Sequence, residues 1–367
     1  MFVDCVVFGK AVLGTWSFSI IITSTCTPLV RYVLEQGAWF PRISSTPVDN
    51  GTLAATAGWQ ASEPSPDAVL VTITLFLLLP LCLSQRLGSL SMFSAIGTLG
   101  TFVTITTMTL RFFDGSYKEG GKFYGDLAPN QIPSFGTDRG ASAFFSSFKS
   151  LTLVSIMTTG YIAHYNAPKY YSELKDHTTG RFNVVVTAGF SLAALTYTLT
   201  STLGFLTFGQ NSMGFILDNY SYRDPLATVA RFGVAVSVVF AYPLLFHGGR
   251  DGLLSLLQTL SASPPRITAT NVVSESNLLT VLLLGTVTTL AIYVNDLTFV
   301  LSISGATMSS LIIYILPPIM FSALVQNCCC YVNEDTERDV KLGTFMMVLG
   351  IVLGGAGACV AVQRAFF

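Results

Sequence analysis

Nine apolar runs, separated from one another by polar stretches, divide the chain of 367 residues from end to end. Their approximate limits are 11–33, 68–84, 90–110, 146–165, 183–207, 226–247, 278–294, 298–323 and 342–363. A helix of roughly 20 apolar residues is long enough to cross the hydrocarbon core of a bilayer. The pattern therefore predicts an all-α, multi-pass membrane protein with about nine transmembrane helices, forming a single domain over residues 1–367.

The fourth apolar run is interrupted. Residues 151–165 read LTLVSIMTTGYIAHY, and the apolar part is too short to cross about 30 Å of hydrocarbon without its polar neighbours. Thr158, Thr159 and Gly160 lie near its middle, where two hydroxyls and a glycine disfavour a helix. A break at membrane depth frees backbone groups that protein, water or solute must satisfy, so such breaks usually line a cavity. These three residues are therefore the first candidates for a solute site.

The composition excludes several classes of function. Hydrophobic residues make up 51% of the chain and charged residues 11%, and the formal net charge is −1. The expected environment is thus the lipid bilayer, and no nucleic acid is expected as a partner. The sequence shows no metal-ligand spacing, no paired nucleophile and base and no phosphate-binding loop. We therefore expect neither an enzyme nor a bound metal or cofactor.

Loop charges predict how the chain lies in the membrane. The shorter loops on the N-terminal side carry most of the lysines and arginines, whereas those on the opposite side carry only Arg223 and Arg231. The positive-inside rule then places the N-terminus in the cytosol and, after nine spans, the C-terminus on the exoplasmic side. The cytosolic charges are Arg86, Lys169, Lys175, Arg181, Arg250, Arg266, Arg338 and Lys341.

Two sequons agree with this orientation. Asn50-Gly51-Thr52 and Asn219-Tyr220-Ser221 both fall in predicted exoplasmic loops, so a glycoprotein modified at Asn50 and Asn219 is expected. The two long loops, at about 35–67 and 112–147, lie on the same predicted side.

Four blocks in the second half of the chain carry a family resemblance. They are GYIAHYNAPKYYSELK (160–175), GFLTFG with ILDNY and DPLATVAR (204–231), FAYPLLFHGGRDGL (240–253) and NDLTFVLSISGAT with YILPP (295–318). Their types, order and spacing resemble the amino acid/auxin permease family. This family includes the sodium-coupled neutral amino acid transporters of animals and the vacuolar amino acid transporters of fungi. The resemblance covers about residues 140–325 closely and the flanks by hydropathy.

The resemblance implies the APC-superfamily fold, in which eleven helices form a five-plus-five inverted repeat. Substrate would lie between the broken first and sixth helices, flanked by the third and eighth. In that register the first apolar run here is similar to the third helix, the fourth to the sixth and the sixth to the eighth. The chain is thus expected to match helices three to eleven and to lack the first two, being incomplete at its N-terminus relative to the family.

The resemblance also implies site residues. Thr159, Gly160 and Tyr161 would be the remaining half of the substrate site, although Tyr161 is equally well explained as an aromatic wedge between helices. In this family sodium would be held by hydroxyls of the eighth helix. Here Val239 and Ala241 stand where sodium-coupled relatives carry threonine-like hydroxyls, and only Ser237 remains nearby. Coupling to H+ or no coupling therefore has the same weight as Na+. His164 and His247 are candidate proton carriers, with packing at helix ends as the alternative.

The resemblance and the sequence together predict a secondary active amino acid transporter that works by alternating access. It would be a symporter if transport is coupled to an ion, and its expected substrates are neutral amino acids. The alternative is an amino acid sensor, or a truncated transporter product that does not transport. Plasma, vacuolar and endosomal membranes all fit the sequence.

Overall fold

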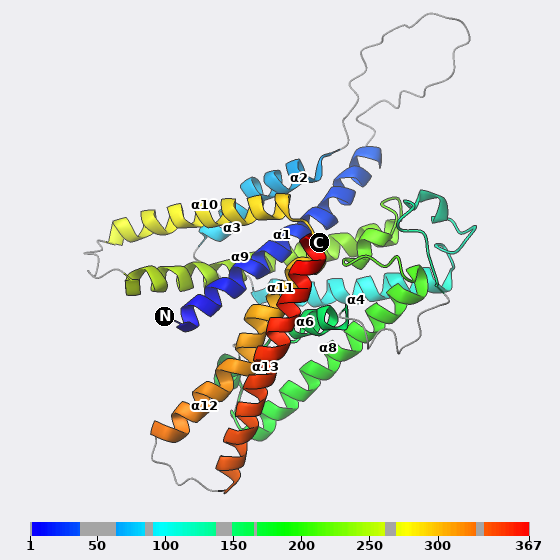
Figure 1. Ribbon diagram of the computed structural model, residues 1–367. Coiled ribbons are helices and arrows are strands. Elements are labelled where there is room, and N and C mark those ends of the chain that lie inside the picture. The colour runs from blue at the N-terminus through cyan, green and yellow to red at the C-terminus, as the bar shows by residue number, and fades with distance from the viewer. Residues whose placement is uncertain are drawn as a thin grey trace, which may run out of the picture.

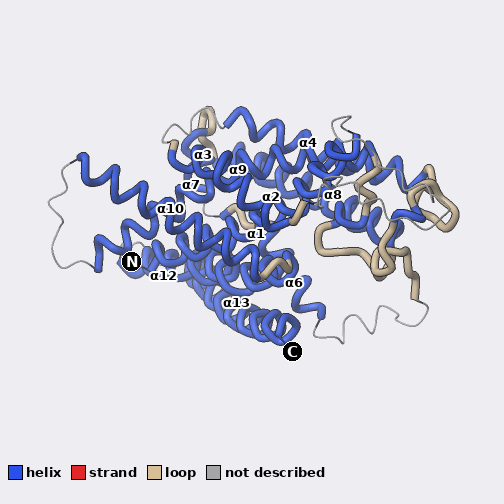
Figure 2. The backbone as a smooth tube through the Cα atoms, turned by 90° about the horizontal axis from the view of Figure 1, so that it is seen from above, coloured by secondary structure: helices blue, strands red, loops and turns tan. Residues whose placement is uncertain are grey.

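A computed structural model describes residues 2–36, 64–84, 91–136, 149–164, 167–260, 269–327 and 334–366. Over these residues the regular structure is helical, apart from one isolated bridge between Ser134 and Gly209. In the view of Figure 1, α4, α9 and α10 run nearly parallel, and α8, α12 and α13 cross them steeply. Figure 2 shows helix throughout the body of the molecule, with most of the loop trace gathered at one side.

The helices follow the apolar runs closely. Several runs are built from consecutive pieces, because π-helical turns (η1, η6 and η7) interrupt the α-helical hydrogen bonding. The elements are α1 Phe2–Gln36, α2 Pro66–Ile73, η1 Thr74–Leu78, α3 Leu79–Leu83, α4 Ser91–Phe113, η3 Tyr124–Asp126, α6 Lys149–Gly160, α7 Ala167–Glu173, α8 Thr179–Phe208, η5 Ile216–Asn219, α9 Pro225–Leu260, α10 Ala269–Tyr293, α11 Leu297–Ser304, η6 Gly305–Ser309, η7 Leu311–Ile315, α12 Leu316–Asn327 and α13 Glu334–Phe366.

Within the described residues, six helical stretches are long and apolar enough to cross a membrane. They are Val3–Glu35, Pro66–Leu83, Thr179–Phe208, Pro225–Leu260, Leu297–Asn327 and Glu334–Phe366. This confirms the predicted all-helical, polytopic architecture. The other three predicted spans fall on the helices α4, α6 and α10, so the number nine and the inverted repeat stay predictions.

Helix α9 lies at the centre of the packing, between α1 and α4. Small residues allow α4 and α9 to touch: a Cβ added to Gly100 would lie 2.9 Å from the carbonyl oxygen of Gly233. Such close approach increases the dispersion contact between helices in a membrane, where no hydrophobic effect drives association. On the opposite side, Ile22 of α1 packs with Tyr242 and Phe246 of α9 and Val300 of α11 in the main apolar core.

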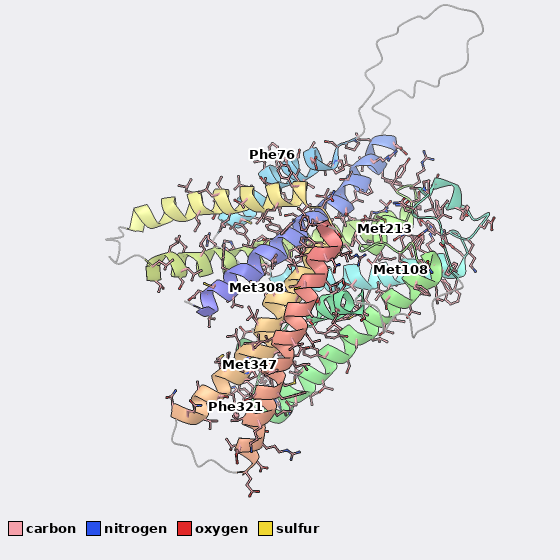
Figure 3. All side chains as sticks on the ribbon, viewed as in Figure 1. Phe76, Met108, Met213, Met308, Phe321 and Met347 are labelled. Atoms are coloured by element: carbon pink, nitrogen blue, oxygen red, sulfur yellow. The ribbon has the colours of Figure 1, made fainter. Side chains whose placement is uncertain are left out.

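A second tight crossing joins α6, η6 and α13. A Cβ added to Gly305 would overlap the carbonyl oxygen of Ser155, and one added to Gly357 would lie 2.5 Å from Ser155 Oγ. Nearby, Met308 of η6, which is labelled in Figure 3, packs against Gly9 of α1, where an added Cβ would lie 2.7 Å from the methionine Cε. The π-helical turn therefore lies where three other helices converge on it.

The connectors 114–134 and 209–224 fold over the ends of α4, α8 and α9 around Asp224 (Figure 1). This carboxylate is fully buried and accepts two hydrogen bonds from Arg111, Nε to Oδ2 at 2.8 Å and Nη2 to Oδ1 at 2.6 Å. It also accepts from the Tyr117 hydroxyl at 3.0 Å and from the Leu226 N–H at 3.0 Å. Burial, and next the charge of Asp224, raise the pKa of Tyr117, so its hydroxyl stays a donor.

The structure contradicts the predicted glycosylation of Asn219. The side chain is 0% exposed; its Nδ2 donates to the carbonyl of Asn211 at 2.8 Å, and its Oδ1 accepts from the Met213 N–H at 2.7 Å. A glycan is attached through this same nitrogen, and the fold leaves it no room. Asn219 is thus a structural residue of the η5 connector. The other sequon, at Asn50, lies outside the described residues.

We therefore expect Asn219→Gln to leave the glycan content of the expressed chain unchanged. The measurement is the electrophoretic shift on treatment with peptide N-glycosidase. Because both buried amide bonds are lost, the same variant should be destabilised by about 1–3 kcal/mol per unsatisfied group. Ser221→Ala is the control, since it removes the sequon and keeps the Asn219 amide. Loss of one glycan in both variants would contradict the structural role.

Candidate functional site

A cavity of about 480 Å³ lies between α4, α8 and α9, and we call it the α4–α8–α9 cavity. This volume is within the usual range for small-molecule sites, about 300–1,000 Å³. Its lining is mostly apolar, with five hydroxyls and no charged residue. The lining residues are Gly97, Thr98, Thr101, Phe102, Gly189, Leu192, Ala193, Thr196, Tyr197, Ser237, Phe240, Ala241 and Leu244.

The hydroxyls of this cavity are oriented by their own helices. Thr101 Oγ1 donates to the carbonyl of Gly97 at 3.3 Å, and Thr196 Oγ1 donates to the carbonyl of Ala193 at 2.9 Å. Their protons are thereby used, so the oxygen lone pairs remain for a donor or a cation. Ser237 lies on the contact between helices, where an added Cβ on Gly97 would be 2.5 Å from its Oγ. The cavity can therefore accept hydrogen bonds from an uncharged or ammonium-bearing solute.

The predicted interruption of the fourth apolar run is present. Helix α6 continues through Thr158 and Thr159 and ends at Gly160, and residues 161–164 are not α-helical. The helix therefore ends at the last of the three residues named in the prediction. The two threonines stay helical, and Thr158 Oγ1 donates back to the carbonyl of Val154 at 2.8 Å. At 12 residues, α6 is about 18 Å long, well short of the hydrocarbon thickness.

The end of α6 contacts the wall of the cavity through Tyr197. The Tyr197 hydroxyl donates to the carbonyl of Gly160 at 2.9 Å. The Tyr161 ring meets the Tyr197 ring edge-on at a centroid distance of 5.3 Å and stacks on Phe190 at 5.9 Å. An aromatic group of α8 thus connects the interrupted helix to the cavity.

The structure separates the three predicted substrate residues. Gly160 and Tyr161 contact Tyr197, which lines the cavity, but none of the three lines the cavity itself. Thr159 faces another helix, since its Oγ1 donates to the carbonyl of Leu301 in α11 at 2.9 Å. The aromatic-wedge interpretation therefore describes the contacts that Tyr161 makes here.

The three predicted coupling residues also separate. Ser237 lines the cavity, and His164 lies exposed beside Phe190, with ring centroids 6.3 Å apart. His247 is buried, and its Nε2 has no hydrogen-bond partner in the described part of the chain. It lies ten residues after Ser237, about 15 Å further along α9, so the cavity and His247 are distinct places.

Sequence reasoning missed Thr98, Thr101, Thr196 and Tyr197. The available signal was the presence of hydroxyls inside the apolar runs 90–110 and 183–207. That signal is weak, because a hydroxyl in a membrane helix is satisfied by its own backbone whichever way it faces. Among the described residues, no group of three or more His, Cys, Asp or Glu side chains is placed to hold a metal ion.

In the part of the chain that the structure describes, six apolar helices are long enough to cross a membrane, and an uncharged, hydroxyl-lined cavity lies between helices. These features define a polytopic membrane protein with room for a small polar solute. Residues 8–360 match the family model described as transmembrane amino acid transporter protein, and the chain belongs to that family.

Curated relatives agree with the family match. The chain is 24% identical over 292 residues to the putative sodium-coupled neutral amino acid transporter 11 of Danio rerio, covering 78% of this chain and 58% of the relative. It is 26% identical over 298 residues to the amino acid transporter AVT6B of Arabidopsis thaliana, covering 77% and 59%. It is 24% identical over 247 residues to the vacuolar amino acid transporter 5 of Schizosaccharomyces pombe, covering 67% and 54%. The chain thus spans less than two thirds of the length of each.

Proposed function

We propose that this chain is a secondary transporter that carries amino acids across a membrane, with the α4–α8–α9 cavity as part of the solute path. The observation that carries the proposal is the hydroxyl-lined cavity joined through Tyr197 to the end of the interrupted helix α6. Irregular backbone inside a membrane is stable only where protein or a water-filled cavity satisfies it. The family match, and relatives named as amino acid transporters, support an amino acid as the solute.

The chemistry of the cavity favours neutral amino acids. No lining residue is charged, so a charged side chain of a solute would be left without a counter-ion in a medium of low dielectric. The substrate ammonium group would be received by the hydroxyl oxygens that line the cavity, and the C-terminus of α6, which Tyr197 holds beside the cavity, adds the negative end of its helix dipole. Neutral amino acids are therefore the proposed substrate class.

The proposed cycle is alternating access in the inverted-repeat fold, with nine spans and a cytosolic N-terminus. The proposed coupling ion is Na+ or H+. Thr98 and Thr101 of α4 line the same cavity as Ser237. They add oxygen atoms to the single hydroxyl that the sequence suggested, which supports a cation near Ser237.

Uptake of radiolabelled neutral amino acids into proteoliposomes tests this function, with Na+ and pH gradients applied separately. We expect Tyr197→Phe to lower the initial rate about fivefold, because it removes the hydrogen bond to Gly160 and keeps the ring. Tyr171→Phe is the matched control: its hydroxyl donates to the carbonyl of His177 at 2.9 Å, away from the cavity, and uptake should be unchanged.

Ser237→Ala distinguishes the coupling modes. If a cation is bound beside Ser237, the sodium or proton dependence of uptake should weaken more than the uptake rate at saturating ion. Absence of uptake of every neutral amino acid by a folded, monodisperse chain would overturn the transport proposal. Binding without uptake would instead indicate a non-transporting sensor.

A further inference from the structure

A second cavity, of about 500 Å³, lies where the end of α1 meets the connectors 114–134 and 216–224. Its polar lining includes Thr27 and Arg31 of α1, Asp126, Asp218, Arg223, and Arg231 near the start of α9. It shares no lining residue with the α4–α8–α9 cavity. We call it the connector cavity.

Arg231 is held in a fixed position in the wall of this cavity. The side chain is 1% exposed, and its terminal nitrogens donate to the carbonyls of Tyr220 at 2.6 Å, Leu217 at 2.7 Å and Ser221 at 3.2 Å. These bonds hold the guanidinium rigidly in place. Its Nε has no hydrogen-bond partner among the described residues. A buried, charged donor left without a partner is costly, and it indicates a place where a bound group completes the hydrogen bonding.

Helix α1 supplies a second unused polar group. Thr27 Oγ1 is buried and has no hydrogen-bond partner in the part of the chain that the structure describes. Thr27 lines the cavity, so this hydroxyl is available on the α1 wall as a donor or an acceptor.

The charges around the connector cavity are mixed in sign. Arg31 and Arg223 lie near its rim: the Arg31 guanidinium lies 4.2 Å from the centre of the Tyr222 ring, and Arg223 is 3.4 Å from the Asp126 carboxylate. With Arg231, three positive groups thus face the two carboxylates of Asp126 and Asp218. Such a wall complements a small molecule that carries a carboxylate and an ammonium group together.

From this geometry we propose that the connector cavity is a binding site for the zwitterionic head of a free amino acid, separate from the α4–α8–α9 cavity. The carboxylate is received by arginine and Thr27 donors, and the ammonium group by Asp218. The choice of an amino acid, and no other zwitterion, rests on the proposed transport function. A site at the end of the helical bundle captures the solute before it enters the other cavity, or regulates its passage through that cavity.

The protonation of Asp218 makes the site sensitive to pH. Burial raises the pKa of this carboxyl to about 6, against the opposing effects of Arg231 and of the hydrogen bond with Ser24. Besides Arg231, the charged groups across the cavity are Arg31, Arg223 and Asp126. The carboxylate accepts an ammonium group above this pKa and loses its charge below it. Affinity should therefore fall as pH decreases from about 7.5 to about 5, and Asp218→Asn should remove this dependence.

Equilibrium binding of each radiolabelled standard amino acid to the purified full-length chain tests the proposal. We expect saturable binding that Arg31→Gln and Asp218→Asn each weaken about tenfold or more, because each removes a charged hydrogen-bonding group. Arg31→Lys keeps the charge without the planar fork and should be intermediate. Arg181→Gln is the matched control, since Arg181 is an exposed arginine paired with Asp176 at 2.9 Å outside the cavity. It should leave binding unchanged.

Competitors and a second cavity variant complete the test. Acetate and ethylamine, which carry one charge each, should compete at least about tenfold less well than the amino acid. Equal competition by acetate would overturn the proposal of a zwitterion site and indicate a site for anions. Binding that responds to Ser237→Ala but not to Arg31→Gln or Asp218→Asn would overturn the proposal and leave transport intact. Binding that Arg31→Gln and Asp218→Asn weaken, in a chain that shows no uptake, would leave the proposal intact and overturn the transport function.

Discussion

Asp224→Ala is expected to lower the stability of the folded chain by about 3–5 kcal/mol, because it removes the buried carboxylate that pairs with the largely buried Arg111 and, among the described residues, leaves this arginine only the exposed Asp114 as a counter-ion. Arg111 is held by two hydrogen bonds to this one carboxylate. The variant also removes the acceptor for the Tyr117 hydroxyl and the cap on the Leu226 N–H at the start of α9. The measurement is the shift in thermal unfolding of the purified protein in detergent, followed by circular dichroism.

The neighbouring Asp114 provides a matched control for Asp224. Asp114 accepts from the same arginine, Nη1 to Oδ2 at 2.7 Å, but its side chain is 39% exposed. Exposed ion pairs contribute about 0–1 kcal/mol, so Asp114→Ala should change stability little. Equal destabilisation by the two alanine variants would show that burial does not determine the role of Asp224.

Gly305→Ala is expected to prevent correct assembly of α6 against η6. The added methyl group would overlap the backbone carbonyl oxygen of Ser155 and lie 2.7 Å from Thr159 Oγ1. A backbone atom cannot rotate away, so the two helices must separate, at a cost of about 3 kcal/mol or more. We expect loss of the monodisperse peak in size-exclusion chromatography, or a large fall in the unfolding temperature, together with loss of uptake.

Gly355→Ala on α13 is the control for this variant. Apart from the backbone of α13 itself, no atom of the described residues lies within 4 Å of a Cβ at Gly355, and alanine favours the helix by about 0.5–1 kcal/mol over glycine. The control should therefore be neutral or slightly stabilising. A Gly305→Ala protein that is as stable as the control would contradict the close contact between α6 and η6.

Local patterns predicted the elements well. The apolar runs identified the helices because the cost of transferring a segment into lipid depends on that segment alone. The interruption after α6 was visible for a similar reason, since a short apolar run and a glycine are local features. Helix α6 ends at Gly160, within the predicted Thr158–Gly160 segment, and the two threonines before it remain helical, with the Thr158 hydroxyl bonded back to Val154.

Tertiary contacts decided the features that the local patterns left open. The Asn219 sequon is a valid triplet, yet Asn211 and Met213 use its amide, and only the folded connector reveals this. The α4–α8–α9 cavity is similar in kind. Its hydroxyls come from three helices spread over residues 97–244, and their convergence depends on the Gly100–Gly233 contact between α4 and α9.

The sequence by itself determined that this protein is an all-helical membrane protein of the amino acid transporter family, because hydropathy and short motifs are properties of contiguous residues. Only the tertiary structure decided which polar groups share a cavity and that Thr159 donates to Leu301. It also showed that Arg231 is buried and that its Nε has no hydrogen-bond partner within the described ranges. The physical reason is the same in each case. The hydropathy of a side chain decides whether its own segment enters the membrane, but the partner of that side chain depends on which helix packs beside it.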